Sequence, residues 1–501
     1  MKTPLKTLEK EQNYYRVPII NSDFFDEAEK LLTTKIGSLF FDTIISCKPE
    51  FVSSHSRFAK KSLVILLGAQ EQHIQSALRL TPLVVHDNPN LKKGFFSKLT
   101  KNDCSYLKHL AVGNVSKHFH IFGVTGTKGK TTTAFFLYQI LESLGFRPAY
   151  VGTLGVLFDG MHVRTLNTTP SLEYILNALL KLRDWGCKSI ALECSSIGLD
   201  QGRCDGLFFD GAIFTGLGHD HLDYHRTMRS YFTAKLRLFK LCAKSPKRRK
   251  TVVFIMNSKW SRMAYLNCPK GLKKLCVYPE KLRIIEADPD QQITASYEKK
   301  VFKTNFFFEP FIISAIACVK LLNSVLNSKL DLGSLSSLIL PPGRLEKIAP
   351  LCFIDYAHTE ESIREVLVSL KKVINKPVVV VFGCGGDRDK SKRPKMGKVA
   401  TTLADYVILT SDNPRSEDPA AIIHDIVSGV KKNNYQIEID RKRAIQKGLK
   451  KALELNGIAL IAGKGHETVQ ILKNKTIPFS DKKVCLDFLR QQKCYCGSLD
   501  L

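Results

Sequence analysis

A glycine-rich stretch between residues 126 and 132 carries the residue types that bind phosphate groups. It reads Gly126, Thr127, Lys128, Gly129, Lys130, Thr131 and Thr132. Glycines let backbone amides approach phosphate oxygens, a lysine can reach the terminal phosphates, and a threonine hydroxyl can bind Mg²⁺. Val124 stands where the usual phosphate-loop pattern has its first glycine. A chance match to the rest of the pattern has a likelihood of roughly one or two per cent, so the stretch predicts a nucleotide site.

A second group of chemically active residues follows further along the chain. Asp220, His221 and Asp223 lie close together, Lys235 follows them, and Glu193 comes directly after the apolar run 190–192. Hard carboxylate oxygens with one imidazole suit Mg²⁺, whereas zinc, the alternative, takes three or four imidazole or thiolate ligands in most sites. A lone glutamate or histidine has a structural role more often than a functional one. Because these residues are clustered, the sequence favours a structural and a functional role about equally.

The elements that must position these residues alternate between strands and helices. Residues 119–125 form a short apolar run typical of a buried strand, and residues 131–144 repeat apolar side chains at helical spacing up to Gly145. The runs 377–382 and 458–462 also end in glycine loops. This alternation predicts an α/β fold with parallel sheets, in which ligands bind at the carboxyl ends of the strands.

Length and composition indicate a globular protein of several domains. The chain has 501 residues, of which 44% are hydrophobic and 24% charged. We expect a smaller N-terminal α/β domain over 1–101, a central domain over 102–341 and a C-terminal domain over 342–501, with a hinge at residues 341–343. The 14 cysteines include no C-x-x-C pair, which argues against a zinc finger or a thioredoxin-like site. No purely apolar run approaches a membrane span, and the charged first thirty residues predict no signal peptide, so we expect a cytoplasmic protein without membrane insertion.

The charge balance is strongly basic, with 75 Lys and Arg against 47 Asp and Glu, a net charge of +28. Such an excess attracts anions, which leaves nucleic acid, an acidic membrane face and phosphate-rich small substrates open as partners. The basic run 244–250 contributes to it. A solvated loop is the favoured interpretation of that run, because Ser245 and Pro246 break the preceding helix pattern and no aromatic residue lies among the charges.

Several blocks of the sequence, in the same order, resemble the Mur ligases, the ATP-dependent amide-forming enzymes of peptidoglycan assembly, and in particular the members that add meso-diaminopimelate. The resemblance extends from about residue 123 to residue 481. Its blocks are Thr125–Thr131, Asn167–Pro170, Asp220–His225, Ala234–Lys235, Gly343–Glu346, Asp355–Thr359, Gly383–Lys390, Asp412–Arg415 and Gly463–Glu467. It implies a central P-loop ATPase-like parallel sheet, a Rossmann-like C-terminal domain and an N-terminal domain that recognises uridine.

The resemblance also implies a reaction and its cofactors. ATP would phosphorylate the γ-carboxylate of D-glutamate in UDP-N-acetylmuramoyl-L-alanyl-D-glutamate, and the amine of meso-diaminopimelate would attack the acyl phosphate. Two Mg²⁺ ions are implied, with Thr131, Glu193 and His221 as ligands. Lys235 would carry CO₂ as a carbamate (N6-carboxylysine). The implied catalytic residues are Lys130, Glu193, His221 and Lys235.

The remaining implied site residues fall into three sets. The implied ATP-binding residues are those of 126–132 together with Arg344, Asp355 and His358. The implied residues for the UDP-sugar peptide are Ser56, Asn167, Thr168, Thr169, Ser195, Gln201 and Arg203. The implied residues for diaminopimelate are Arg388, Asp412, Asn413, Arg415, Gly463 and Glu467. The chain is expected to be a monomer without a specific nucleic-acid partner.

Two other functions stay open on the sequence alone. One is a folylpolyglutamate-type ligase of the same architecture, against which Asp412–Arg415, Gln201 and Arg203 argue. The other is a non-catalytic scaffold that binds nucleic acid, which the net charge allows. Lys128, Ile197, Gly216 and the residues after Asn257 depart from the pattern of the resembled family.

Overall fold

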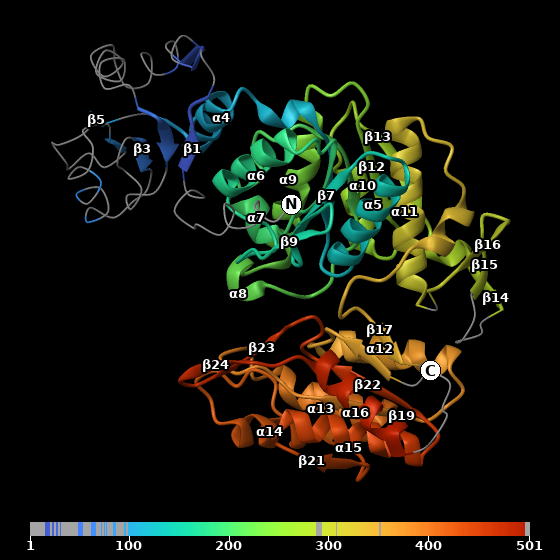
Figure 1. Ribbon diagram of the computed structural model, residues 1–501. Helices are drawn as coiled ribbons and strands as arrows, with labels where there is room; N and C mark the ends of the chain where they lie inside the picture. The colour runs from blue at the N-terminus through green and yellow to red at the C-terminus, as the bar shows by residue number, and fades with distance from the viewer. Residues whose placement is uncertain are drawn as a thin grey trace. The chain divides into compact units, whose positions relative to one another are not determined.

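The computed structural model describes residues 99–286, 293–306, 308–349 and 352–495 of the chain. Of the first 98 residues it describes 16–20, 23–24, 27–28, 31, 49–53, 62–66, 72, 75, 77, 84–86 and 95–96. The chain forms two compact units (Figure 1). Unit 1 comprises Met1–Lys281 and Ile313–Ser334, and unit 2 comprises Leu282–Ile312 and Leu335–Leu501. The boundaries expected for the three domains, 1–101, 102–341 and 342–501, remain a prediction.

Unit 1 contains a small N-terminal sheet in the order β1-β2-β3-β4-β5. Its strands are β1 (Arg16–Pro18), β2 (Phe51–Ser53), β3 (Ser62–Leu66), β4 (Val84–His86) and β5 (Phe95–Phe96). The pair β1 and β2 is antiparallel and the other pairs are parallel. Ser56, the N-terminal residue predicted to contact the UDP-sugar peptide, lies outside the described residues.

The main sheet of unit 1 has the order β13-β12-β11-β6-β10-β7-β8-β9. Its strands are β6 (His120–Thr125), β7 (Pro148–Gly152), β8 (Gly155–Phe158), β9 (Met161–Val163), β10 (Ser189–Glu193), β11 (Phe209–Phe214), β12 (Thr251–Ile255) and β13 (Lys273–Val277). Strands β13 to β7 pair in parallel, and β8 and β9 add an antiparallel edge. All the parallel strands except β13 are buried along nearly their whole length, as expected for a sheet covered on both faces.

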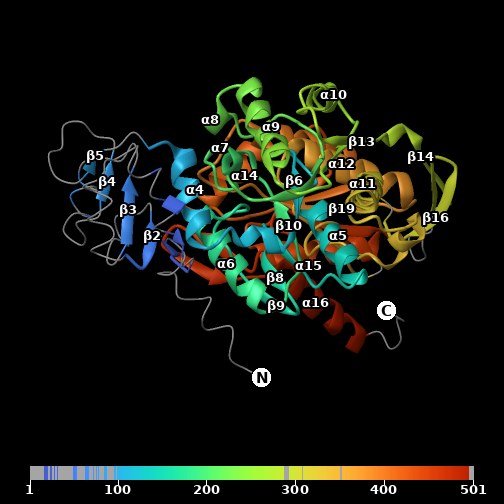
Figure 2. The same cartoon turned by 90° about the horizontal axis from the view of Figure 1, so that it is seen from above.

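Helices cover both faces of this sheet (Figures 1 and 2). They are α4 (Lys101–Ala111), α5 (Lys130–Ser143), α6 (Leu172–Asp184), α7 (Ser196–Asp200), α8 (Leu222–His225), α9 (Met228–Lys244), α10 (Lys259–Leu266) and α11 (Glu309–Leu326), with the short 3₁₀ helices η4 (Val115–His118), η5 (Pro279–Lys281) and η6 (Leu332–Ser337). Gly123 of β6 leaves room for Leu238 of α9, and Gly211 of β11 leaves room for Leu321 of α11 on the other face.

One described helix, α11, is long and apolar enough by composition to cross a membrane, with a mean hydropathy of 1.6 over its 18 residues. Its packing accounts for that composition. Ile316, Leu321 and Leu322 are fully buried, and the thiol of Cys318 lies 3.4 Å from the carbonyl oxygen of Thr133 in α5. The helix therefore contributes its apolar side chains to the core of the protein.

Unit 2 is built on a sheet in the order β17-β18-β22-β19-β20-β21, in which all pairs except β17–β18 are parallel. Its strands are β17 (Glu346–Ala349), β18 (Cys352–Asp355), β19 (Val378–Phe382), β20 (Tyr406–Leu409), β21 (Tyr435–Ile437) and β22 (Ile458–Ala462). Its helices are α12 (Glu360–Val373), α13 (Lys392–Leu403), α14 (Pro419–Val427), α15 (Arg441–Glu454) and α16 (Asp481–Tyr495). Two antiparallel sheets accompany them, β14 (Leu282–Glu286) with β15 (Ile293–Tyr297) and β16 (Lys300–Thr304), and β23 (Val469–Leu472) with β24 (Lys475–Pro478).

The predicted α/β fold with a central parallel sheet is confirmed. The strand expected over 119–125 is β6, and the helix expected over 131–144 is α5. The basic run 244–250 is a loop, as favoured, but it is not wholly solvated. Lys247 donates to the carbonyl oxygens of Lys117 and Phe119, and Lys250 to those of Ala243 and Ser245, because these carbonyl groups lie at the ends of neighbouring elements.

A buried histidine in α4 makes the stability of unit 1 depend on pH. Burial lowers the pKa of His109 from 6.5 to about 4, and its Nε2 lies 2.9 Å from the carbonyl oxygen of Asp205. Between pH 6.5 and 4 the unfolded chain binds the proton that the folded chain rejects, so stability falls with falling pH by up to about 1.4 kcal/mol per pH unit. Urea unfolding of the wild-type protein and of His109→Gln between pH 7 and 5 measures this slope. We expect the slope to be shallower in the variant, and parallel curves would contradict the assignment.

Candidate active site

The predicted phosphate loop connects the end of β6 to the start of α5, at the carboxyl edge of the main sheet. Gly129 precedes α5 with φ of +80°, a left-handed conformation that favours glycine. A Cβ atom on Gly126 would lie 1.9 Å from Oγ1 of Thr215, so no side chain fits there. The amide of Thr127 donates to the carbonyl oxygen of Gly216 at 3.0 Å. The loop is therefore held against the loop that follows β11.

Two lysines converge on the carbonyl oxygen of Gly126. Lys130 of α5 donates to it at 2.9 Å and Lys235 of α9 at 2.8 Å. Lys235 is 1% exposed, and its ammonium lies 4.4 Å from the ring centre of Tyr231. Burial, with a further contribution from the charge of Lys130, holds the pKa of Lys235 well below its usual range. Burial thus makes the neutral amine of Lys235 easier to reach than that of a solvated lysine.

Glu193, at the end of β10, lies beside the hydroxyl of Thr131. Thr131 Oγ1 donates to Glu193 Oε2 at 3.0 Å, and the amide of Thr153 donates to Oε1 at 2.8 Å. The hydroxyl of Tyr150 also donates to Oε1. The carboxylate is fully buried. A hydroxyl and a carboxylate next to a phosphate loop match the oxygen ligands that Mg²⁺ prefers, so the predicted metal residues Thr131 and Glu193 are brought together.

His221 lies close enough to Lys130 and Lys235 for their charges to act on its ring, but in the described part of the chain no hydrogen bond or ion pair joins it to Glu193. It precedes α8 with φ of +52°, and its Nε2 lies 3.5 Å from Asp220. Burial lowers the pKa of His221, Asp220 raises it, and the charges of Lys130 and Lys235 lower it. Among the described residues, no group of three or more His, Cys, Asp or Glu side chains is placed to hold a metal. A zinc-type ligand set is therefore absent from that part of the chain.

Two of the residues predicted for the UDP-sugar peptide, Thr168 and Thr169, lie beside Glu193, and others are linked to them by hydrogen bonds. Thr168 Oγ1 lies 3.1 Å from Thr153 Oγ1, whose hydroxyl lies 3.3 Å from Glu193. Thr169 donates to the carbonyl oxygen of Glu193 at 2.7 Å and also contacts Ser195. Arg203 donates to the carbonyl oxygen of Thr169 and to the side-chain oxygen of Gln201. Asn167 is exposed, and its carbonyl oxygen accepts from the hydroxyl of Thr165.

In unit 2 the residues predicted for diaminopimelate follow the carboxyl ends of β19, β20 and β22, which are adjacent in the sheet. The side chains of Arg388 and Arg415 both lie close to Gly385. A Cβ atom there would be 2.9 Å from Nη1 of Arg415 and 3.8 Å from Cγ of Arg388. Arg415 also donates to the carbonyl oxygen of Gly386 at 2.8 Å. The side chains of two arginines therefore lie at one edge of this sheet.

Asn413, Glu467 and Asp412 complete this group. Asn413 Nδ2 donates to Glu467 Oε2 at 2.7 Å. Gly463 has φ of +113°, and a Cβ atom there would lie 2.6 Å from Asp412 Oδ2. Burial raises the pKa of Asp412, and the nearby Arg441 lowers it. The structure thus brings all six predicted diaminopimelate residues to neighbouring loops of unit 2.

The three predicted ATP residues outside the phosphate loop belong to unit 2 and surround Tyr356. The guanidinium of Arg344 lies 4.6 Å from the ring centre of Tyr356, and the ring of His358 lies 4.8 Å from it. Asp355 accepts from the amides of Leu345 and Ala357, both at 2.7 Å. Burial raises the pKa of Asp355, and Arg344 lowers it.

Several residues that were not predicted from the sequence hold these loops, and all of them except Thr153 are buried. In unit 1 they are Tyr150, Thr153, Thr215 and Tyr231, and in unit 2 they are Arg393, Arg441 and Lys464. Arg441 pairs with Asp481 at 2.7 Å and donates to the carbonyl oxygens of Ser411 and Ala462, which precede the loops of Asn413 and Lys464. Arg441 begins the amphipathic helix α15, and a charged residue at that position does not indicate a buried supporting role. Lys464 lies inside the block Gly463–Glu467 that carries part of the family resemblance.

Comparisons with known proteins agree with this geometry. Residues 124–309 match the family model of the Mur ligase middle domain, and residues 343–465 match that of the Mur ligase glutamate ligase domain. The UDP-N-acetylmuramoyl-L-alanyl-D-glutamate–2,6-diaminopimelate ligase of Clostridium perfringens is 37% identical over 395 residues, which cover 75% of this chain and 80% of that protein.

Solved structures show the same fold. One of a UDP-N-acetylmuramoyl-L-alanyl-D-glutamate–2,6-diaminopimelate ligase has a TM-score of 0.62 at 28% identity and covers 88% of this chain and 94% of that one. The folylpolyglutamate synthase of Mycobacterium tuberculosis has a TM-score of 0.58 at 14% identity, covering 78% of this chain and 94% of that one, which is a likeness of fold alone.

The two family models and the named relatives, together with the phosphate loop, show that the chain is an ATP-dependent ligase. The chain belongs to the Mur ligase family. The resemblance seen in the sequence is thereby confirmed.

Proposed function

We propose that the chain is the ATP-dependent ligase that adds meso-diaminopimelate to the D-glutamate γ-carboxylate of UDP-N-acetylmuramoyl-L-alanyl-D-glutamate. The observation that supports this most directly is the group formed by Arg388, Arg415 and Glu467 in unit 2. Guanidinium groups suit a second carboxylate, and a carboxylate suits a second ammonium. Meso-diaminopimelate has both groups at its distal end, whereas L-lysine has only the ammonium. Relatives named for this reaction support the same conclusion.

The proposed reaction forms an acyl phosphate first. A carboxylate oxygen of the substrate attacks the γ-phosphorus of ATP, and ADP leaves. The neutral amine of diaminopimelate then attacks the acyl carbon, the carbon–oxygen bond to the phosphate breaks, and inorganic phosphate and a proton are released. The ammonium of Lys130 would stabilise the negative charge that develops on the transferred oxygens.

Thr131 and Glu193 fit a magnesium ion, because their oxygens meet at the end of the phosphate loop. Bound there, Mg²⁺ supplies charge neutralisation to the phosphate oxygens. His221 would contribute to the second ion. The buried hydrogen bonds from Thr153 and Tyr150 hold the Glu193 carboxylate in place before any ion arrives.

Lys235 would react with CO₂ to form a carbamate, with loss of one proton. Two observations support this: the pKa of Lys235 is lowered by burial, which favours the free amine, and the neighbouring charge of Lys130 repels an ammonium at this position. A carbamate on Lys235 is negatively charged, so the positive charge of Lys130 would attract it instead of repelling it. It also adds oxygens, the atoms that Mg²⁺ prefers.

We make further proposals for the binding of the nucleotide substrate and for the cellular location and oligomeric state of the protein. Thr168, Thr169, Ser195, Gln201 and Arg203 would bind the peptide part of the nucleotide substrate, since hydrogen bonds connect them to one another and, through Thr153 and Thr169, to Glu193 in unit 1. The N-terminal region would recognise uridine. We propose a cytoplasmic monomer, and we attribute part of the net charge of +28 to its polyanionic substrates.

Replacing Arg415 with alanine is expected to weaken diaminopimelate much more than ATP. The variant loses the guanidinium proposed to bind the distal carboxylate, a charged hydrogen bond worth about 1.5–3 kcal/mol, or about 10- to 150-fold in KM. Steady-state kinetics with each substrate varied in turn measure both Michaelis constants. Equal increases in the two constants would contradict the assignment of Arg415.

Phosphate release in the presence of the UDP-muramoyl dipeptide tests the proposed function. ATP, Mg²⁺ and bicarbonate are supplied, and meso-diaminopimelate is compared with L-lysine at equal concentration. We expect rapid release with diaminopimelate and little with L-lysine. Equal rates, or release with a folate substrate in place of the dipeptide, would contradict the proposal.

A further inference from the structure

Lys464 lies in the loop after β22, between Gly463 and Glu467, and is fully buried. Its ammonium donates to Asn413 Oδ1 at 3.0 Å, to Glu467 Oε2 at 2.9 Å and to the carbonyl oxygen of Val469 at 2.7 Å. An ammonium has three N–H groups, and all of them are engaged. Lys464 therefore has no donor left for a substrate, and any role in the reaction must act through its neighbours.

The neighbours of Lys464 are two of the residues proposed to bind the amino-acid substrate. Asn413 Oδ1 also accepts from the amide of Ile471 at 2.9 Å, and Asn413 Nδ2 donates to Glu467 Oε2. These bonds join the loops after β20 and β22 to strand β23. Glu467 Oε2 thus takes two donors, whereas Oε1 has no hydrogen bond from the described residues. The side chain of Glu467 is 30% exposed, so Oε1 is the oxygen left for a ligand.

We infer that Lys464 is a positioning residue that sets the orientation of Glu467 and Asn413 for the amino-acid substrate. By binding Oε2, its ammonium directs Oε1 to the distal ammonium of the incoming amino acid. This inference rests on the proposed function of the same pocket. Lys464 would thus contribute to the pocket without contacting the ligand itself.

Packing alone does not account for a charged group at this position. Burying an ion pair costs desolvation energy, and an apolar side chain of similar volume is often as stabilising or more so. Here the charge is compensated by three acceptors, of which two belong to side chains of the pocket. The network therefore fixes these two side chains relative to each other, as expected of a preorganised binding site.

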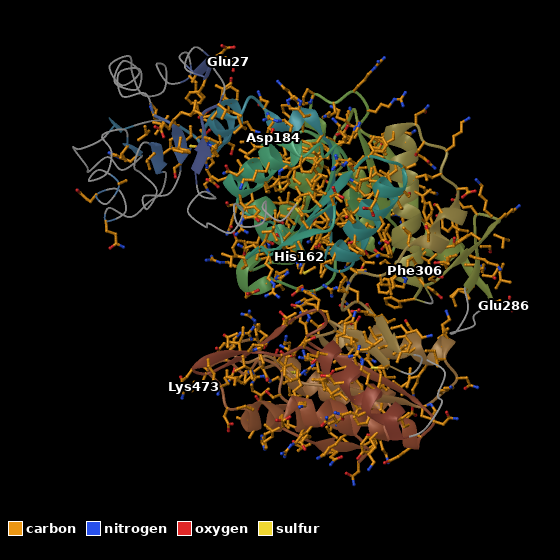
Figure 3. The ribbon with its side chains drawn as sticks, viewed as in Figure 1. Glu27, His162, Asp184, Glu286, Phe306 and Lys473 are labelled. Carbon is orange, nitrogen blue, oxygen red and sulfur yellow. The ribbon has the colours of Figure 1, made fainter. Side chains whose placement is uncertain are left out.

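The test compares Lys464→Met with the control Lys473→Met, which makes the same change at an exposed turn of the β23–β24 hairpin nearby in the chain (Figure 3). In Lys464→Met we expect the KM for diaminopimelate to rise about 10- to 100-fold. The KM values for ATP and for the UDP-muramoyl dipeptide should stay within about two-fold, with kcat at saturating diaminopimelate largely kept. The control should match the wild-type protein. An unchanged KM for diaminopimelate, or an equal rise in all three constants, would overturn the inference.

The double variant Lys464→Met/Glu467→Gln covers the case in which the single variant does not fold. Removing both charges leaves neither an unpaired buried ammonium nor a carboxylate without its partner, so the double variant should retain a cooperative thermal transition. If Lys464 acts through Glu467, the KM for diaminopimelate should equal that of Glu467→Gln alone. A KM that is the product of two separate effects would overturn the inference. If the wild-type protein shows no turnover that depends on diaminopimelate, the proposed function itself fails, which is a different outcome from an active enzyme unaffected at Lys464.

Discussion

The Lys235→Ala variant is expected to lose about 100- to 1,000-fold in kcat, because it removes the group proposed to carry the carbamate beside the phosphate loop. Lys235 is buried and contacts Gly126 and Tyr231, so the shortened side chain leaves a space beside the phosphate loop. Acetate should restore part of the activity, since its carboxylate can enter the space left by the shortened side chain. Phosphate release with and without acetate measures both effects.

Lys240→Ala is the matched control, because Lys240 is an exposed lysine on the same helix. It should leave kcat unchanged. In the wild-type protein, removal of dissolved CO₂ and bicarbonate should lower activity slowly, and their return should restore it. A Lys235→Ala protein with full activity, or a loss of activity that neither acetate nor any other small carboxylate relieves, would contradict the carbamate proposal.

The second large effect is expected for Glu193→Gln. Glutamine has nearly the same shape as glutamate, and its one amide oxygen can still accept from the amide of Thr153, while its NH2 group can donate to the hydroxyl of Thr131. It has no charge to attract a divalent ion. We expect kcat/KM to fall by about 100-fold or more and the Mg²⁺ concentration for half-maximal activity to rise. Kinetics at several Mg²⁺ concentrations measure both quantities.

Glu142→Gln serves as the control, since Glu142 is an exposed glutamate on α5. It should change neither quantity. If Glu193→Gln lowered activity to the same extent at every Mg²⁺ concentration, Glu193 would have a structural role through Tyr150 and Thr153, and the metal assignment would be wrong.

The sequence predicted those parts of the fold that depend on local pattern. The phosphate loop was found because glycine, lysine and threonine types are each required there, and β6 and α5 follow from hydrophobic spacing within one residue of their observed bounds. The antiparallel edge strands β8 and β9 were not predicted, because short partly exposed strands give little periodic signal.

The supporting residues of the candidate site could not be predicted, because their partners are distant in the sequence. Arg441 contacts Asp481, 40 positions away, and Lys464 contacts Asn413, 51 positions away. A charged side chain in such a position has the same sequence signal as one on a solvated surface. Only the three-dimensional arrangement shows that it is buried. The roles of the predicted site residues themselves stay predictions until they are tested.

The most direct test of the account follows an oxygen atom from substrate to product. The UDP-muramoyl dipeptide is labelled with ¹⁸O in the γ-carboxylate of its D-glutamate and is incubated with ATP, Mg²⁺, bicarbonate and meso-diaminopimelate. If the carboxylate is phosphorylated before the amine attacks, the phosphate that leaves must carry one ¹⁸O atom for each amide formed. Phosphate released without ¹⁸O would show that its extra oxygen comes from water, and would contradict the acyl-phosphate reaction proposed for this chain.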